Sequence, residues 1–201
     1  MFCAIDIDGT IAMGGIPGDL RANMNYFKEL GIPLPDDITD FPTLLHHPYV
    51  IPLHSALPGA IWGVAHVATM GSVGYFTVRK HADSQQQSLI YEATQQWLRQ
   101  KAFPNPMQVV LCNSVLHKLI KLYEQEKDNQ EPFVLIDDKW SQVVQHFDAV
   151  FSEDHRQMGQ AIKERLTLLA YGVSVVPAVT NGLRLVPLPS WDHIVDIHFC
   201  S

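Results

Sequence analysis

Short apolar runs alternate with amphipathic segments along most of the chain. Five runs are bounded by polar or turn residues and have the length of buried strands: 2–5, 73–76, 109–112, 133–136 and 149–151. Between them, helix-start signals and amphipathic periodicity predict helices over 59–70, 84–101 and 115–124. Strands that alternate with helices predict an α/β protein, in which a parallel sheet carries helices on both faces.

Two stretches depart from this alternation. Residues 11–55 are rich in Pro, Gly and His, contain one predicted helix over 19–30, and form a connection of a length that is usually functional. We therefore expect a core made of residues 1–10 and 56–201, with 11–55 as a small insertion. After residue 151 the pattern predicts four elements. These are a helix over 156–170, a strand over 173–176, a hairpin turn over 180–183 and a strand over 195–199.

Composition narrows the class of protein. A chain of 201 residues with 47% hydrophobic residues can form a stable core without disulfides or a structural metal. Fourteen Lys and Arg against 21 Asp and Glu give a formal charge of -7, and no stretch concentrates the basic residues. A nucleic-acid polymer is therefore not an expected partner, and a phosphate site would need a local cluster of donors and a metal.

The cysteines and the apolar segments bear on the compartment. Cys3, Cys112 and Cys200 are odd in number, far apart and set among apolar residues, which predicts reduced and mostly buried thiols. No segment has the apolar length of a signal peptide or of a membrane span. We expect a cytoplasmic protein without a membrane partner, either a monomer or a homodimer.

The segment Asp6-Ile7-Asp8-Gly9-Thr10 directly follows the first predicted strand. In open α/β sheets, ligands bind just beyond the carboxyl ends of the strands. The period of two in extended backbone places Asp6 and Asp8 on one side and Ile7 on the other. Such a pair suits a hard cation and a reaction that needs a nucleophile and a proton donor. The alternative is that the aspartates only start a turn.

Other strand ends supply further residues that phosphoryl transfer requires. The second strand ends at Thr77, Lys118 follows the third, and the fourth ends in Asp137-Asp138. The succession of DxDGT, a strand-terminal Thr, a Lys early in a later helix and an Asp-Asp pair resembles the four signature motifs of haloacid dehalogenase-type phosphatases. The resemblance spans residues 1 to about 150 and implies a Rossmann-like core in which the insertion 11–55 forms a cap.

The resemblance also implies a role for each matching position. Asp6 corresponds to the nucleophile that forms an aspartyl-phosphate, and Asp8 to the general acid and base. The carboxylate of Asp6, the main-chain carbonyl of Asp8, and Asp138 with Asp137 correspond to the site of a Mg²⁺ cofactor. The implied catalytic residues also include Thr77 and Lys118. The implied substrate-binding residues are Gly9, Thr77, Val78, Arg79 and Lys118.

Some positions admit more than one interpretation. Lys121 lies one helical turn after Lys118 and is its rival, although Lys118 is nearer the strand end. Arg79 and Lys80 could bind a second anionic group of the substrate or be exposed charges on a loop. The spacing of His46, His47 and His54 fits no usual zinc pattern, so we interpret them as surface histidines of the insertion.

These observations predict a Mg²⁺-dependent phosphohydrolase that acts on a small phosphomonoester. The Asp-Asp form of the fourth motif and the chain length loosely resemble 5'-nucleotidases of the deoxyribonucleotide type. A phosphotransferase or phosphomutase would use the same Asp6 and Asp8. A noncatalytic binding protein with this fold is the third alternative, and the presence of all the motif residues argues against it.

Overall fold

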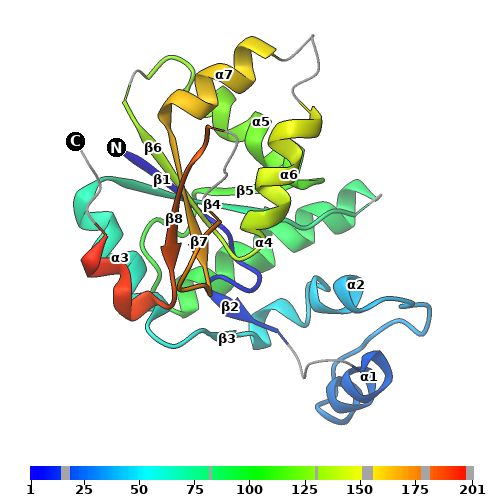
Figure 1. Ribbon diagram of the computed structural model, residues 1–201. Helices are drawn as coiled ribbons and strands as arrows, with labels where there is room; N and C mark the ends of the chain where they lie inside the picture. Colours follow the sequence, from blue (N-terminus) through cyan, green and yellow to red (C-terminus); the bar gives the residue numbers. More distant parts are fainter. Residues whose placement is uncertain (15–18, 82, 130, 151–155, 178–181, 198–201) are drawn as a thin grey trace.

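The computed structural model describes residues 1–14, 19–81, 83–129, 131–150, 156–177 and 182–197. Its centre is a six-stranded sheet in the order β5-β4-β1-β6-β7-β8, and all neighbouring pairs are parallel (Figure 1). The strands are β1 (Phe2–Ile5), β4 (Ser72–Val78), β5 (Val109–Cys112), β6 (Phe133–Asp137), β7 (Leu166–Tyr171) and β8 (Arg184–Leu188). This arrangement confirms the predicted α/β class.

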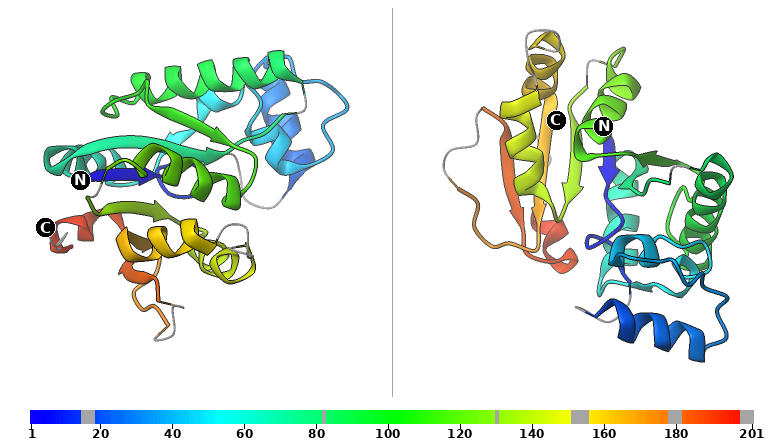
Figure 2. Two further views of the ribbon diagram at one scale, coloured as in Figure 1. Left: turned by 90° about the horizontal axis from the view of Figure 1, so that it is seen from above. Right: turned by 90° about the vertical axis from the view of Figure 1, so that its right-hand side faces the viewer.

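Helices cover both faces of the sheet, as the views in Figure 2 show. One face carries α3 (Ala60–Met70), α4 (Ser84–Gln100) and the 3-10 helix η3 (Trp191–Asp196). The opposite face carries α5 (Val115–Glu126), α6 (Trp140–Val150) and α7 (Arg156–Arg165). Alternate residues of β1 supply the two cores, because Cys3 and Ile5 pack on one face while Phe2 and Ala4 pack on the other.

The chain after β1 leaves the sheet and returns through a short ribbon. Strands β2 (Ala12–Met13) and β3 (Ser55–Ala56) pair antiparallel and flank α1 (Leu20–Glu29), α2 (Phe41–Leu45) and the 3-10 helix η1 (Ile51–Leu53). Figure 1 shows α1 and α2 beside the sheet rather than on one of its faces. They have an apolar cluster of their own, which contains Phe27, Ile38, Leu44 and Val50.

The region after α6 differs from the sequence-based prediction. The predicted helix over 156–170 ends at Arg165, and the next residue begins β7, a buried central strand. Residues 173–176 are not a strand, and β8 pairs parallel to β7, so the predicted hairpin is wrong. Residues 180 and 181 of the predicted hairpin turn lie outside the described residues. The helix and the strand follow each other with no loop residue between them. The basic residues Lys163 and Arg165 in the last helical turn were the available signal that the helix ends there.

Two further predicted strands are wrong for a related reason. The segment 149–151 was predicted as a strand, but α6 continues through residue 150, and residue 151 lies outside the described part. Val143 and Phe147, four residues apart, anchor this helix on the sheet. Residues 195 and 196 belong to η3 instead of a terminal strand, because Trp191 and Ile194 pack against α3. Residues 198–201 lie outside the described part.

The structure also bears on the thiols and on the histidines of the insertion. Cys3 and Cys112 are unpaired and buried, as predicted, and Cys200 is outside the described residues. No helix in the described ranges has the length and apolarity needed to cross a bilayer.

The interpretation of His54 as a surface residue is wrong, because its ring is buried next to η1. Burial, with the nearby positive charge of Arg79, lowers the pKa of His54 to about 4, so the ring is uncharged.

Candidate active site

In the turn after β1, the side chains of Asp6 and Asp8 point to a different side from that of Ile7. The carbonyl of Ile7 accepts hydrogen bonds from the amides of Thr10, Ile11 and Ala12 at 3.3, 3.0 and 2.9 Å, and the Ile7 side chain is buried in the core. Asp6 and Asp8 instead line one pocket. Gly9 has a φ of +86°, and a Cβ atom there would collide with the Asp138 carboxylate. Glycine therefore allows β1 and β6 to bring their acidic ends together.

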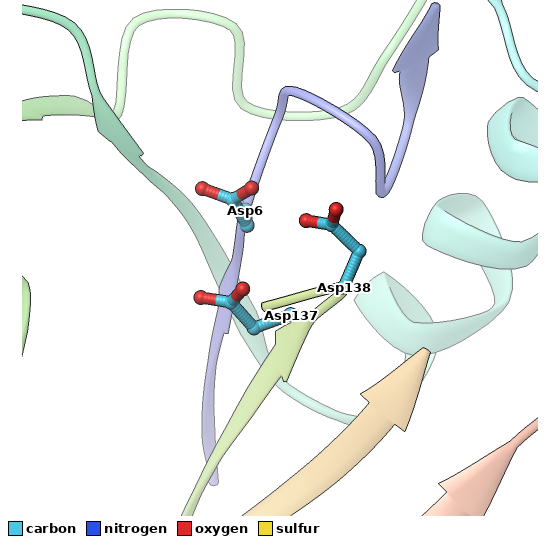
Figure 3. Close-up of side chains that lie close together, drawn as sticks. All are labelled: Asp6, Asp137 and Asp138. Atoms are coloured by element: carbon cyan, nitrogen blue, oxygen red, sulfur yellow. The ribbon is translucent and has the colours of Figure 1, made fainter. Parts of the chain in front are cut away.

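Three carboxylates meet at the ends of β1 and β6. Asp6, Asp137 and Asp138 each present an oxygen, and these oxygens lie within 4.8 Å of one another (Figure 3). The parallel pairing of β1 with β6 sets this geometry, and the amide of Asp6 donates to the carbonyl of Ile136 at 2.9 Å. Thr10 supports Asp138, because its hydroxyl oxygen accepts from the Asp138 amide at 3.0 Å.

Lys118 of α5 lies between two of these carboxylates. Its Nζ is 2.6 Å from Asp6 Oδ1 and 2.7 Å from Asp137 Oδ2, and only 2% of its side chain is exposed. Burial alone would lower the pKa of Lys118, but the charges of Asp6 and Asp137 outweigh it and raise that pKa. Lys118 is therefore a fixed cation. Lys121, the rival, is half-exposed and pairs with Glu124 outside this cluster.

The acidic cluster carries more negative charge than Lys118 neutralises. With all three carboxylates ionised, one ammonium would leave an excess of two negative charges in a largely buried site. Burial raises the pKa of Asp6 to about 8, and the neighbouring Asp137 and Asp8 add to this effect while Lys118 opposes it. Burial and Asp137 also raise the pKa of Asp138. The donor set, all carboxylate oxygens, and the excess charge both fit a hard divalent cation.

Asp8 belongs to a separate ion pair with Arg79. The guanidinium holds the carboxylate through Nε at 2.8 Å and Nη2 at 2.7 Å, and Nη1 donates to Thr94 Oγ1 at 2.7 Å. The Thr77 hydroxyl also donates to Asp8, at 2.9 Å. Burial would raise the pKa of Asp8, but Arg79, with His46, holds it well below its usual range. Asp8 is therefore ionised and oriented.

The interpretation of Arg79 as an exposed loop charge or a substrate contact does not fit this arrangement. Its side chain is fully buried behind Asp8. The two-residue spacing from Thr77 was the available signal. Side chains two apart in extended backbone point the same way, so a site-facing Thr77 at the end of β4 predicts a site-facing Arg79.

The pocket at this end of the sheet has a volume of about 90 Å³. It brings together five of the predicted site residues, namely Asp6, Asp8, Thr77, Val78 and Lys118. Gly9, Arg79, Asp137 and Asp138 do not line it, although Arg79 contacts Asp8 and Asp137 contacts Lys118. The remaining described lining residues are His46, Val115, Lys139 and Gln142.

Sequence reasoning missed His46. Its Nε2 atom lies 3.4 Å from Asp8 Oδ2, so a residue of the insertion reaches the carboxylate after β1. This contact depends on how the insertion folds back over the sheet, and no local pattern around His46 reports it. The interpretation of His46 as a surface histidine is therefore wrong.

A larger cavity, of about 250 Å³, lies at the opposite edge of the sheet. Met1, Pro132, Leu166 and Arg184 are among its lining residues, and they mark the amino ends of the strands. None of the predicted site residues lines it. Ligands of open α/β sheets bind at the carboxyl ends of the strands, and the acidic cluster is there, so we assign the site to the smaller pocket.

Comparison with known proteins gives matches in structure. No protein-family model and no curated protein matches the chain by sequence. A putative haloacid dehalogenase-like hydrolase from Burkholderia xenovorans superimposes over 98% of this chain and 95% of its own, with 15% identity and a TM-score of 0.51. A HAD-superfamily hydrolase of subfamily IA from Geobacter sulfurreducens superimposes over 97% of both chains, with 14% identity and a TM-score of 0.48.

A third structure, a HAD family hydrolase from Deinococcus radiodurans with bound phosphate and sodium, covers 93% of this chain and 90% of its own. Its identity is 12% and its TM-score 0.40. At these identities the comparisons concern the fold, and the match to the Burkholderia protein extends over nearly the whole of both chains. The chain thus has the fold of the haloacid dehalogenase superfamily of hydrolases.

Proposed function

We propose that the protein is a Mg²⁺-dependent phosphohydrolase that acts on a small phosphomonoester. One observation carries the proposal. Asp6 lies in a pocket beside the fixed cation Lys118 and the carboxylate of Asp8, within a cluster of three carboxylates that Lys118 alone does not neutralise. A nucleophile, a proton-transfer group and a divalent-cation site therefore occur together at the end of the sheet where this fold class binds ligands.

In the first step, an Asp6 oxygen attacks the phosphorus atom of the bound ester. A bond forms between Asp6 and phosphorus, the bond from phosphorus to the leaving oxygen breaks, and the leaving oxygen takes a proton from Asp8. Lys118, at 2.6 Å from Asp6, offsets the negative charge of the nucleophile and of the incoming phosphoryl group. The Thr77 hydroxyl, which donates a hydrogen bond to Asp8 in this structure, would donate to a phosphoryl oxygen instead.

In the second step, water attacks the phosphorus atom of the aspartyl-phosphate and gives a proton to Asp8. The products are the alcohol, inorganic phosphate and free Asp6. Resting Asp8 is ionised, so its proton for the first step must arrive with the substrate. The monoanionic ester can carry it, since the second phosphate pKa is about 6. The negative phosphoryl group then favours protonation of Asp8 by like-charge repulsion.

Asp6, Asp138 and Asp137 would hold the Mg²⁺, together with the main-chain carbonyl of Asp8. When bound, the cation neutralises the excess charge of the cluster and that of the phosphoryl group. Two of these ligand residues are held in place by neighbours. Lys118 donates a hydrogen bond to the Asp137 carboxylate, and the Asp138 amide donates one to the Thr10 hydroxyl oxygen.

The proposal is tested by release of inorganic phosphate from a panel of phosphomonoesters that includes nucleotides and sugar phosphates. We expect turnover with Mg²⁺ and none with EDTA. Added alcohols and sugars distinguish a phosphotransferase, because transfer to them would appear as new phosphate esters in place of inorganic phosphate. Absence of both products for every ester would contradict the proposal and favour a noncatalytic binding protein.

The same site predicts a metal-dependent stability. Mg²⁺ at about 100 times its Kd should stabilise the folded protein by about 2.7 kcal/mol, because the unfolded chain has no preformed cluster. Asp138→Asn should abolish this effect in thermal unfolding experiments with Mg²⁺ or EDTA. Asp128→Asn removes an exposed carboxylate and is the matched control. Equal responses of the two variants would contradict the assignment of the cation site.

A further inference from the structure

A second hollow adjoins the proposed phosphoryl pocket on the side of the insertion. It is lined by Thr43, His46, His47 and Pro48 of the insertion and by Lys80, His81, Gln86 and Ile90 of the core. His46 lines both spaces, so the hollow lies directly beside the pocket that contains Asp6. The leaving group of a substrate is the part that would enter it.

The hollow is lined with donors and a cation. Lys80 is exposed, follows β4 by two residues, and forms no ion pair with a described acidic residue. No Asp or Glu is among its described lining residues. In a chain with a formal charge of -7, this lining combines the positive charge of Lys80 with three histidine rings that can donate hydrogen bonds. Such a lining favours a negatively charged ligand.

His47 and His81 each use one ring nitrogen to accept a hydrogen bond from the backbone, which leaves the other ring nitrogen available as a donor. The Nδ1 atom of His81 accepts from the amide of Asp83 at 3.1 Å, and Nδ1 of His47 accepts from the amide of Tyr49 at 3.4 Å. In each neutral ring the proton is therefore on Nε2, which can donate to a ligand. Both rings line the same hollow. Burial, and then the nearby His81, lowers the pKa of His47.

The loop that carries Lys80 and His81 is braced. Gln87 of α4 accepts from the His81 amide at 2.6 Å and donates to the Arg79 carbonyl at 3.0 Å. These bonds join both ends of the short segment to one side chain. The backbone that carries Lys80 and His81 is thus held beside the hollow before a ligand arrives, which reduces the entropy lost on binding.

We propose that the substrate's leaving group carries a second anionic group, a carboxylate or a phosphate, which binds in this hollow to Lys80, His47 and His81. This inference rests on the proposed function, because it takes the reacting phosphoryl group to be at Asp6. The hollow has a volume of about 40 Å³. That space admits a compact group of a few atoms and is too small for a nucleobase, so the substrate is a short bifunctional acid and not a nucleotide.

Binding tests the inference without turnover. With Mg²⁺ present, titration calorimetry compares 3-phosphonopropanoate with propylphosphonate, which has a methyl group in place of the carboxylate. Charge-assisted hydrogen bonds should give the first ligand about tenfold higher affinity. Lys80→Met should remove most of that preference, because it should weaken binding of 3-phosphonopropanoate far more than binding of propylphosphonate. Lys121→Met removes the same charge from α5 outside both pockets and should keep the preference. Equal affinities in the wild-type protein would overturn the inference.

Turnover separates this inference from the proposed function. The esters are propane-1,3-diol monophosphate, its bisphosphate, 3-phosphonooxypropanoate and a deoxynucleoside monophosphate. We expect kcat/KM about tenfold higher for the two esters with a second anion than for propane-1,3-diol monophosphate, whose second group is an uncharged hydroxyl. The ratio should fall towards one in Lys80→Met. Hydrolysis of propane-1,3-diol monophosphate or of the nucleotide at equal or higher efficiency would overturn the inference but support the phosphatase. A Lys80-dependent binding preference without hydrolysis of any ester would support the second anion site but contradict the phosphatase.

Discussion

Replacing Asp6 by asparagine should lower the rate of phosphate release by about 10³-fold or more, because the amide oxygen cannot serve as the attacking nucleophile. The fold should survive this change. Asp6 is one of three clustered carboxylates, and Lys118 keeps its contact with Asp137 when Asp6 is neutral. Without metal, burial and the neighbouring Asp137 disfavour the ionised form of Asp6, as its raised pKa indicates, and asparagine removes that group. We therefore expect equal or higher thermal stability in EDTA.

The measurement combines phosphate release with thermal unfolding of the same preparations. Asp128→Asn is the matched control, since it makes the same chemical change at an exposed position after α5. An Asp6→Asn protein that is folded but retains wild-type turnover would show that another residue is the nucleophile. Activity lost together with the folded state would instead show that Asp6 has a structural role, which the Lys118–Asp137 contact argues against.

Much of the sheet could be predicted because its strands have local signals. Strands β1, β4, β5 and β6 are short apolar runs with polar ends, and the helices between them start at capping residues such as Asp83 and Ser114. The site-forming half of the chain is built from these units. Parallel pairing then places Asp6 and the pair after β6 at one edge, so their proximity follows from topology alone.

The tail was predicted less well because its elements are determined by packing. The apolar run of β7 fits either a helix or a strand by periodicity, and its place between β6 and β8 selects the strand. In the same way, Trp191 and Ile194 form one side of a 3-10 helix only because α3 lies beneath them. Local pattern cannot report which surface a segment will cover.

The site itself shows the same division. Asp6, Asp8, Thr77 and Lys118 follow strand ends, and the structure brings them together in one pocket. The contact of His46 with Asp8 joins segments that no sequence pattern connects. The ion pair between Arg79 and Asp8, which are 71 positions apart, had only the indirect signal of the two-residue spacing of Arg79 from Thr77. Charged residues acquire their roles from burial and partners, so their sequence patterns alone leave the roles open.

The ion pair of Asp8 with Arg79 predicts an asymmetric effect on stability. Asp8→Ala leaves a fully buried guanidinium without its carboxylate, which should lower the free energy of unfolding by about 3–5 kcal/mol. Arg79→Met should cost about 1–2 kcal/mol, because Asp8 keeps the Thr77 hydroxyl and 23% of its side chain is exposed to water. Urea unfolding at neutral pH without metal measures both values.

The double variant Asp8→Ala with Arg79→Met provides the control. It removes the buried charge together with its partner, so it should be more stable than Asp8→Ala alone. Simple addition of the two single effects would contradict a coupled ion pair. The pH dependence provides a second check, because Arg79 lowers the pKa of Asp8 below its unfolded value of about 3.9. The contribution is then complete above that pH and lost as pH falls through the lower folded-state pKa, so wild type and Asp8→Ala should converge only in strong acid.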